Sequence, residues 1–269
     1  MIPAASLTDK LHRAQNLLRD LESVVVAFSG GIDSSLVLKL AHDTLGEGAI
    51  AVTAVSPTFP DVELEATRRI AAEIGARHEI VETDQLQIPE FVRNDATRCY
   101  HCKTDLYSLL GTLRQTYHSK HIVDGTNVDD LGDDRPGLKA AREWGVRSPL
   151  LEADLSKAEI RELAKELGLS NWDKPAAACL SSRVPRGTPI TLETLSRVEK
   201  AEAILAGEGF RHCRVRDHGE IARIEIAPGE FARLLEPSRM ARVTAAVKRA
   251  GYRFVTLDLE GYRQGGVSL

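Results

Sequence analysis

The stretch 23–35, Ser-Val-Val-Val-Ala-Phe-Ser-Gly-Gly-Ile-Asp-Ser-Ser, constrains the fold of this chain more than any other. Its apolar, β-branched part, 24–28, predicts a strand buried on both faces of a parallel sheet. Gly30 and Gly31 then allow backbone angles and close approaches that other residues cannot adopt. From Asp33 onward the apolar residues recur at helical spacing. Strand, glycine turn and helix start therefore direct backbone N–H groups at one point, which favours an anion such as phosphate.

Two other phosphate-binding glycine loops do not match this stretch. A Walker-type loop requires a Gly-Lys pair, which occurs nowhere in the chain, and the adjacent glycines do not fit G-x-G-x-x-G. The segment 29–34 instead resembles the PP-loop of enzymes that split ATP between its α and β phosphates. That resemblance implies a nucleotide site formed by Ser29, Gly30, Gly31, Asp33 and Ser34, in which the loop holds pyrophosphate and the aspartate helps to place Mg²⁺. The alternative is an ordinary strand-to-helix turn with a serine cap.

Strands that alternate with helices predict an α/β fold with a doubly wound parallel sheet. Further strands are expected at 49–55 and 78–81, and a helix is expected at 61–74. The segment 121–127 is expected to be a strand that runs into a turn. Ligands of such sheets bind beyond the carboxyl ends of the strands. Gly125 follows the last of these strands, and it either helps to seat the nucleotide, as a glycine does there in PP-loop enzymes, or is a plain turn glycine.

The pattern changes in the last third of the chain. Helices expected at 192–206 and 238–250 enclose two adjacent strands, 210–216 and 220–226, and a final strand is expected at 252–259. This order indicates a smaller C-terminal α+β domain. We therefore expect a PP-loop ATP pyrophosphatase domain at 1–175, a substrate-binding or oligomerisation domain at 190–269, and a linker at 176–189 that carries Cys179 and Arg183.

Composition narrows the class of protein. The chain has 269 residues and a formal net charge of −4, so there is no electrostatic argument for a nucleic-acid partner. Charged residues interrupt the first twenty positions, and no apolar run approaches the length of a membrane span. A cytoplasmic protein without a membrane partner is expected, in which cysteines stay reduced and point to metal binding or catalysis.

Three of the four cysteines form the most informative cluster. Cys99 and Cys102 make a C-x-x-C pair, which puts two sulfurs on one turn, and Cys179 lies far along the chain. Three thiolates could hold a [4Fe-4S] cluster with one iron left open, bind zinc together with His101 or Cys213, or act as a redox dithiol. Cys213 alternates with apolar residues on an expected strand, which favours a role in the core.

Basic residues gather in two segments. They are Lys174, Arg183 and Arg186 on either side of Cys179, and Arg214, Arg216, Arg223 and Arg263 in the C-terminal part. Solvated arginines are the default interpretation. Beside an ATP site these side chains could instead bind a second phosphate or a polycarboxylate substrate.

Four segments together give a narrower resemblance. The runs 27–34, 135–139, 181–188 and 214–216 are similar to the LarE family, ATP-dependent sulfur transferases that mature the nickel-pincer nucleotide cofactor of lactate racemase. The resemblance implies ATP, Mg²⁺ and a small-molecule nucleotide substrate, pyridinium-3,5-biscarboxylic acid mononucleotide, of which one carboxylate is adenylated and then thiolated. It also implies a sulfide donor and a homo-oligomer.

Site residues carry over by position. Lys103 would contact the activated substrate or phosphate, and Glu202 would lie near the substrate pocket. The pocket itself would be lined by Ser182, Arg183, Arg214, Glu225, Glu230 and Arg263.

The cysteines define a subgroup of that family. The subgroup that sacrifices one cysteine has it at the position of Ala178 here, so the resemblance implies the other route. In that route Cys99, Cys102 and Cys179 hold a [4Fe-4S] cluster whose open iron carries the sulfide. Three alternatives remain: a PP-loop tRNA thiolase, an amide-forming PP-loop ligase with zinc or structural cysteines, and a nucleotide-binding sensor without catalysis.

Overall fold

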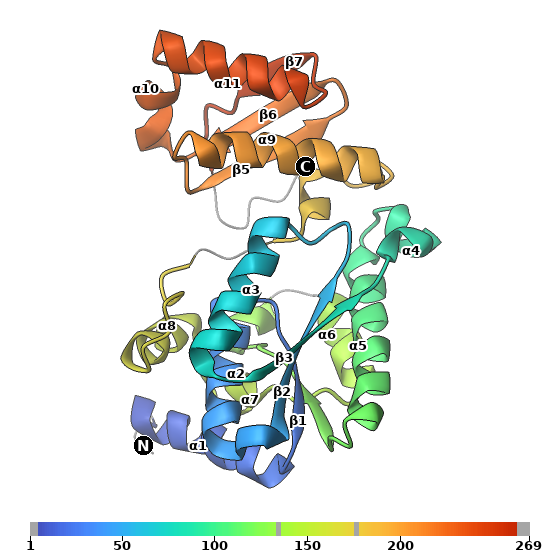
Figure 1. Ribbon diagram of the computed structural model, residues 1–269, viewed down its shortest axis with the longest axis vertical. Helices are drawn as coiled ribbons and strands as arrows, with labels where there is room; N and C mark the ends of the chain where they lie inside the picture. Colours follow the sequence, from blue (N-terminus) through green and yellow to red (C-terminus); the bar gives the residue numbers. More distant parts are fainter. Residues whose placement is uncertain (1–4, 133–135, 175–177, 263–269) are drawn as a thin grey trace. The chain divides into compact units, whose positions relative to one another are not determined.

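The computed structural model describes residues 5–132, 136–174 and 178–262. The chain divides into two compact units that are interleaved along the sequence. The first unit comprises 1–56, 61–83 and 99–176; the second comprises 57–60, 84–98 and 177–269. Both units can be followed by colour in Figure 1, and two short stretches from the N-terminal half thus belong to the second unit.

The first unit is built on a four-stranded parallel sheet with the order β3-β2-β1-β4. Its strands are β1 (Val24–Ala27), β2 (Ala49–Val55), β3 (Arg77–Glu82) and β4 (His121–Val123). Its helices are α1 (Leu7–Leu21), α2 (Ile32–Leu45), α3 (Asp61–Ile74), α5 (Arg98–Thr116), α6 (Pro136–Glu143), α7 (Pro149–Glu152) and α8 (Lys157–Glu166), with 3-10 turns η1 (Gly46–Gly48) and η3 (Val128–Gly132). The α/β fold with a parallel sheet is therefore confirmed.

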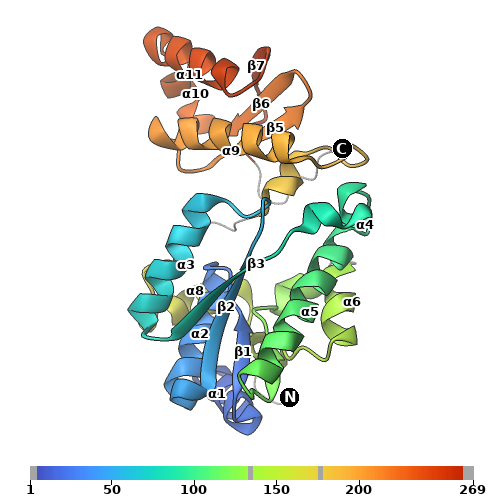
Figure 2. The same cartoon turned by 45° about the vertical axis from the view of Figure 1, so that its right-hand side comes forward.

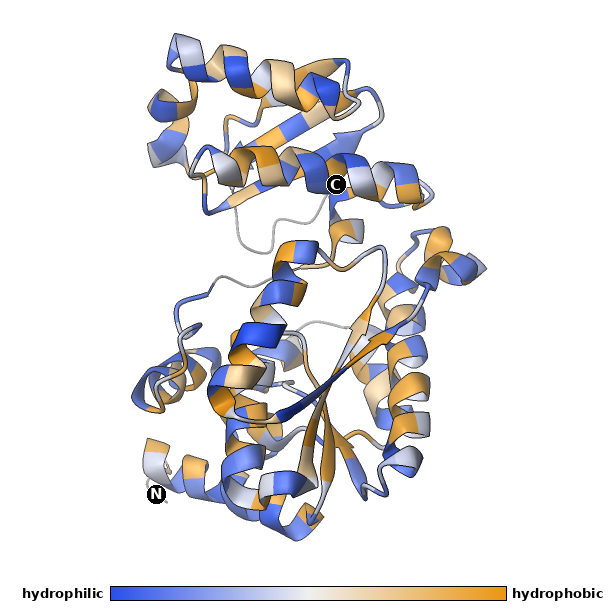
Figure 3. Ribbon diagram, in the orientation of Figure 1, coloured by the Kyte–Doolittle hydropathy of each residue, from blue (hydrophilic) through white to orange (hydrophobic). Residues whose placement is uncertain are grey.

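Alternate residues of strand β1 belong to two separate hydrophobic cores, one on each face of the sheet. Val24 and Val26 belong to a core shared with α1, α2, α3 and α8, whereas Val25 belongs to one shared with α5 and α6. Because successive side chains of a strand point to opposite faces, the sheet is covered on both sides, as Figures 1 and 2 show. The outer strand β3 is more exposed than β1 and changes from hydrophilic to hydrophobic along its length in Figure 3.

The second unit has a three-stranded sheet with the order β5-β6-β7, in which β5 and β6 are antiparallel and β6 and β7 parallel. Its elements are η2 (Gln85–Gln87), α4 (Pro89–Val92), η4 (Leu180–Arg183), α9 (Leu192–Gly207), β5 (Cys213–His218), β6 (Ile221–Ile226), η5 (Pro228–Glu230), α10 (Phe231–Leu234), α11 (Pro237–Arg249) and β7 (Phe254–Leu257). Apolar residues of α9, α11 and the strands share one core. The expected smaller sheet domain is thus present.

Asn94 fastens one of the inserted stretches into the second unit. Its fully buried side-chain amide donates hydrogen bonds of 2.9 Å to the carbonyl oxygens of Pro185 and Thr188. Leu180 N–H also donates to the Thr58 carbonyl at 3.0 Å. The segment 178–189, expected to be part of a linker, is therefore packed against residues far away in the sequence. Within the described parts of the chain, no helix is long and apolar enough to cross a membrane.

Candidate active site

The PP-loop segment lies between β1 and α2 and is folded tightly on itself. Gly30 has φ +66°, and a Cβ atom there would stand 3.0 Å from Thr67 Cγ2 and 3.3 Å from the Thr67 nitrogen. Ser34 Oγ accepts a hydrogen bond from Ser29 N–H at 3.2 Å and donates one to the Gly31 carbonyl at 3.1 Å. Gly31 is the N-cap of α2 and brings no capping side chain, so N–H groups of the first turn are left for an anion.

Gly125 lies directly against the start of α2. A Cβ atom at this glycine would be 2.8 Å from Ser34 N and 2.9 Å from the Asp33 carbonyl carbon, which is closer than real Cβ contacts allow. The turn after β4 can therefore approach the loop only because residue 125 has no side chain. Sequence reasoning predicted Gly125 at the nucleotide site, and the structure brings it beside two of the predicted loop residues.

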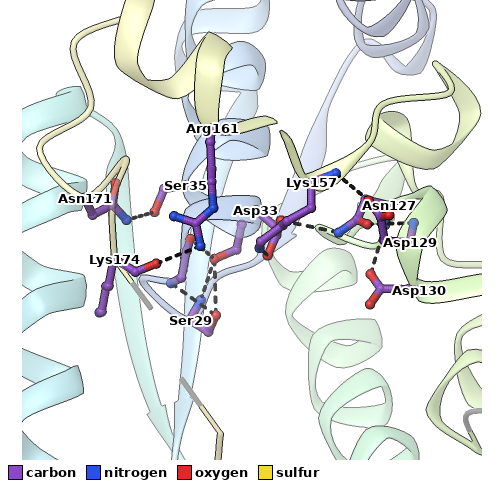
Figure 4. A network of polar contacts seen from close by, with 12 residues as sticks. Ser29, Asp33, Ser35, Asn127, Asp129, Asp130, Lys157, Arg161, Asn171 and Lys174 are labelled. Atoms are coloured by element: carbon purple, nitrogen blue, oxygen red, sulfur yellow. Dashed lines mark hydrogen bonds and ion pairs between the residues drawn. The ribbon is translucent and has the colours of Figure 1, made fainter. Parts of the chain in front are cut away.

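Asp33 projects from the first turn of α2 and contacts two side chains from distant segments (Figure 4). Its Oδ1 accepts from Asn127 Nδ2 at 3.3 Å, and its Oδ2 pairs with Lys157 Nζ at 2.5 Å. The Lys157 N–H in turn donates to Asp129 Oδ2 at 2.5 Å. The side chain of Asp33 is 26 % exposed, so solvent and ligands can reach it.

Lys157 was not identified from the sequence, although a signal existed. It is the first residue of α8, directly after the capping serine Ser156. A cation in the first turn of a helix faces the positive end of the helix dipole and is unfavourable there. A nearby anion offsets this unfavourable interaction, and in the structure that anion is the Asp33 carboxylate.

A second lysine lies on the other side of the loop, as Figure 4 shows. Lys174 Nζ donates to the Gly30 carbonyl at 3.2 Å and pairs with Glu63 Oε2 at 2.6 Å. Asn171 Nδ2 also donates to the Gly30 carbonyl, at 3.2 Å, and to Ser35 Oγ at 2.9 Å. The segment that follows α8 thus fixes the outer side of the loop. Lys174 was noticed in the sequence only as one of the basic residues near Cys179.

The C-x-x-C pair lies at the start of α5, a helix that was not expected from the sequence. Cys99 is exposed and Cys102 is half-buried. Lys103 follows them, with its Nζ 5.4 Å from the centre of the Tyr107 ring. Tyr107 is buried and donates a 2.9 Å hydrogen bond to Asp124, and burial together with that carboxylate raises its pKa well above the ordinary value. Tyr107 therefore stays a protonated hydrogen-bond donor.

The side chains of the predicted ligands can be compared with the ligand types that Mg²⁺ and an iron–sulfur cluster prefer. The Asp33 carboxylate and the Asn127 amide beside it are oxygen-bearing groups of the kind that suits Mg²⁺. Cys99 and Cys102, three residues apart on one helix face, are of the kind that suits an iron–sulfur cluster. Cys179 is exposed and belongs to the second unit. Among the described side chains, no group of three or more His, Cys, Asp or Glu residues is arranged to hold a metal ion.

In the second unit, charged side chains occupy the face of the small sheet that is turned away from its apolar core. Arg214 pairs in register with Glu225, and Arg216 with Arg223, so all four lie on this face. Glu225 is 5 % exposed and accepts hydrogen bonds from Arg216 at 2.9 and 3.1 Å and from Arg223 at 3.1 Å. Arg216 also donates to the Ser182 carbonyl at 2.9 Å. Arg216 thus connects Ser182 with Glu225, and Arg214 lies in register with Glu225 on the same face.

Arg183 is buried, and it forms hydrogen bonds both with Glu202 and with the backbone at residues 178 and 179. Its guanidinium makes a two-point contact with Glu202, at 2.9 and 3.0 Å. The same group donates to the carbonyl oxygens of Ala178 and Cys179, at 2.6 and 2.9 Å. Glu202 also accepts from the Val215 N–H at 3.0 Å. Arg183 therefore fixes the backbone next to Cys179.

Two further predicted pocket residues remain, Glu230 and Arg263. Glu230 pairs with Arg233 at 3.0 Å, on the short turn before α10. Arg263, and Arg135 of the run 135–139, lie outside the described residues.

The Arg183–Glu202 pair gives a testable stability effect. Replacing Arg183 with methionine is expected to lower the free energy of unfolding by about 3 kcal/mol, because Glu202 would keep a charge without its buried partner. Urea-induced unfolding measures the change. Arg242→Met removes an exposed ion pair with Glu208 and should cost about 0.5 kcal/mol. Equal effects for the two variants would contradict the buried role of Arg183.

Cys213 differs chemically from the other cysteines. It is buried on β5, and burial raises the pKa of its thiol to about 12. At pH 8 roughly one molecule in 10⁴ then carries the reactive thiolate at this position. We expect iodoacetamide to alkylate the exposed Cys99 and Cys179 at least about 100-fold faster than Cys213 in the metal-free protein. Peptide mapping by mass spectrometry gives the rates, and comparable labelling of Cys213 would refute its core role.

The sequence of this chain is similar to one protein family model and to known proteins. The asparagine synthase family model matches residues 6–117. Pyridinium-3,5-bisthiocarboxylic acid mononucleotide synthase of Lactiplantibacillus plantarum is 42% identical over 262 residues, which cover 97% of this chain and 94% of that protein. An uncharacterized Synechocystis protein is also 42% identical, over 96% of this chain and 97% of its own length.

A more distant similarity is confined to part of the chain. A glutamine-hydrolysing GMP synthase polypeptide of Saccharolobus solfataricus is 26% identical over 162 residues, 55% of this chain and 44% of that protein. The relative from Lactiplantibacillus, by contrast, aligns over nearly the whole length of both chains. This chain therefore belongs to the family of pyridinium-3,5-bisthiocarboxylic acid mononucleotide synthase, the LarE family of PP-loop enzymes.

Proposed function

We propose that this protein is an ATP-dependent sulfurtransferase that converts pyridinium-3,5-biscarboxylic acid mononucleotide into its thiocarboxylic form. The observation that carries the proposal is the 42% identity with the named synthase over 97% of the chain. The geometry of the PP-loop supports it, because the uncapped start of α2 presents N–H groups at the loop, and the ammonium groups of Lys157 and Lys174 contact Asp33 and the Gly30 carbonyl beside it.

The first step of the proposed reaction is adenylation of a substrate carboxylate. A carboxylate is a poor electrophile, and transfer of AMP onto its oxygen gives it a good leaving group. The loop from Ser29 to Ser34 would hold the pyrophosphate that is released, with Asp33 as a ligand of Mg²⁺. Lys103, a half-buried residue directly after the C-x-x-C pair, would contact the activated carboxylate or its phosphate.

The charged face of the second unit would bind the substrate. Arg214, Ser182 and Glu225 lie on or against this face, and Arg216 connects two of them. A mononucleotide with two carboxylates carries negative charge that arginine recognises through paired N–H donors. Arg183 and Glu202 would shape this site by fixing the neighbouring backbone, and Glu230 and Arg263 stay predictions for the same pocket.

The sulfur would come from a centre held by Cys99, Cys102 and Cys179. A [4Fe-4S] cluster held there would supply a sulfide that replaces AMP on the activated carboxyl carbon, without loss of a protein sulfur. Position 178 is alanine, which supports a route that does not consume a cysteine there. A further support lies within the second unit, where Arg98, the residue before Cys99, donates to the Ser181 carbonyl at 3.0 Å. Cys179 is two residues from that carbonyl in the chain.

A turnover experiment tests the proposal. Protein prepared without oxygen is incubated with ATP, Mg²⁺, sulfide and the biscarboxylic mononucleotide, and mass spectrometry follows the exchange of oxygen for sulfur. We expect several thiocarboxylate products per chain and one pyrophosphate per product. Fewer than one product per chain would contradict a catalytic route. Thiolation of tRNA with salt-sensitive binding, in place of the mononucleotide, would identify the protein as a tRNA thiolase instead.

A further inference from the structure

Asp33 has a cation, the ammonium group of Lys157, as its partner. Lys157 Nζ lies 2.5 Å from Asp33 Oδ2, while Asn127 Nδ2 contacts the other carboxylate oxygen. A carboxylate paired with an ammonium group on one oxygen has less negative charge to offer a metal ion. The ammonium group of Lys157 therefore occupies a place, next to the Asp33 carboxylate, where a metal cation could bind instead.

This pair is built so that it can exchange. The side chains of Lys157 and Asp33 are 29 % and 26 % exposed, so opening the contact does not leave a buried charge. The backbone of Lys157 is fixed by the bond from its N–H to Asp129. Its ammonium group, in contrast, sits on a flexible four-carbon stem and can reach a new anion without any movement of α8.

The second lysine at the loop is held differently. Lys174 Nζ donates to the Gly30 carbonyl and pairs with Glu63, and its side chain is 20 % exposed. Neither partner is a predicted metal ligand. Of the two lysines at the loop, Lys157 is therefore the one paired directly with the predicted metal ligand Asp33.

We propose that Lys157 is a resident cation on Asp33, which Mg²⁺ displaces when it arrives with ATP, and that the freed ammonium group then pairs with the ATP phosphates. Lys157 thus weakens metal binding to the empty site and strengthens binding of the metal–nucleotide complex. The inference rests on the assignment of Asp33 as a Mg²⁺ ligand in the proposed function, but not on the identity of the sulfur acceptor.

The proposal predicts changes of opposite sign in one variant, Lys157→Met. Electron paramagnetic resonance measures binding of Mn²⁺ alone, as a substitute for Mg²⁺, and calorimetry measures binding of Mg²⁺·ATP. Without the ammonium group, Mn²⁺ affinity in the absence of nucleotide should rise about tenfold, whereas affinity for Mg²⁺·ATP should fall about tenfold. Lys157→Arg keeps the charge and should leave both affinities within about threefold of the original protein.

Two further variants make the outcome decisive. Lys39→Met removes another lysine–aspartate pair on the same helix as Asp33, with Asp43 at 2.7 Å, and should change neither affinity. An unchanged or lower Mn²⁺ affinity in Lys157→Met would overturn the exchange and leave a purely structural ion pair. If Asp33→Asn binds Mn²⁺ as the original protein does, the assignment of Asp33 itself fails, whatever the sulfur acceptor proves to be.

Discussion

Replacing Gly125 with alanine should lower ATP-dependent pyrophosphate release by at least about 100-fold. The added Cβ would meet Ser34 N at 2.8 Å and the Asp33 carbonyl carbon at 2.9 Å, and both of these are backbone atoms that cannot rotate away. The start of α2 must then shift, and a displacement of about 1 Å in an active site costs on the order of 10²-fold in rate. The same overpacking should lower stability by about 1–3 kcal/mol.

Gly207→Ala is the matched control for this substitution. Gly207 is the last residue of α9, and nothing lies within 4 Å of the position that its Cβ would take. This variant should keep its activity and be neutral or slightly stabilised. Rates of pyrophosphate release and thermal unfolding are measured for both variants. Wild-type activity in Gly125→Ala would show that the loop tolerates movement. It would also contradict the assignment of Gly125 to the nucleotide site.

The second large effect concerns Cys179. Alanine at this position should reduce thiocarboxylate formation at least about 100-fold while pyrophosphate release stays within about threefold, because adenylation does not use the thiol. Because Cys179 is exposed, its replacement should change the free energy of unfolding by no more than about 0.5 kcal/mol. Product analysis by mass spectrometry, alongside iron and sulfide content, separates the two half-reactions.

The two other predicted ligands and the buried cysteine complete the comparison. Cys99→Ala and Cys102→Ala should behave as Cys179→Ala does, with loss of bound iron in each variant. Cys213→Ala should keep both iron and turnover, since the thiol of Cys213 is buried in the core of the second unit. Iron loss in the Cys213 variant alone would argue for a different ligand set, whereas full turnover in Cys179→Ala would exclude this residue from sulfur delivery.

Much of the first unit could be predicted because its local signals and its tertiary contacts agree. The run 24–27 is apolar on both alternating sets of positions, and its residues do belong to the two cores on either side of the sheet. In the second unit, Cys213 and Val215 alternate with arginines, which correctly indicated one apolar and one charged face of a strand. Helix α5 was not expected, because its apolar residues are too sparse to form a clear stripe beside the C-x-x-C pair.

The candidate site was predictable where one short segment carries the chemistry. The loop residues Ser29 to Ser34 are contiguous and could be found by pattern, and Gly125 could be placed because strand ends share an edge of the sheet. Asn127, Lys157 and Asn171 come from turns and a helix start whose meeting with the loop depends on packing. No local pattern encodes such long-range contacts. For Arg183, a charge near Cys179 could be read from the chain, but its burial against Glu202 could not.

The interleaving of the two units limits how this protein can be cut into parts. A fragment that starts at residue 177 would lack Asn94, whose amide ties down the carbonyl oxygens of Pro185 and Thr188. Such a fragment would also lack the Thr58 carbonyl that receives the Leu180 N–H. A C-terminal fragment that starts at residue 177 would therefore contain backbone groups that have lost their hydrogen-bond partners. Exchange of the whole second unit between relatives requires the transfer of three separate sequence blocks rather than one.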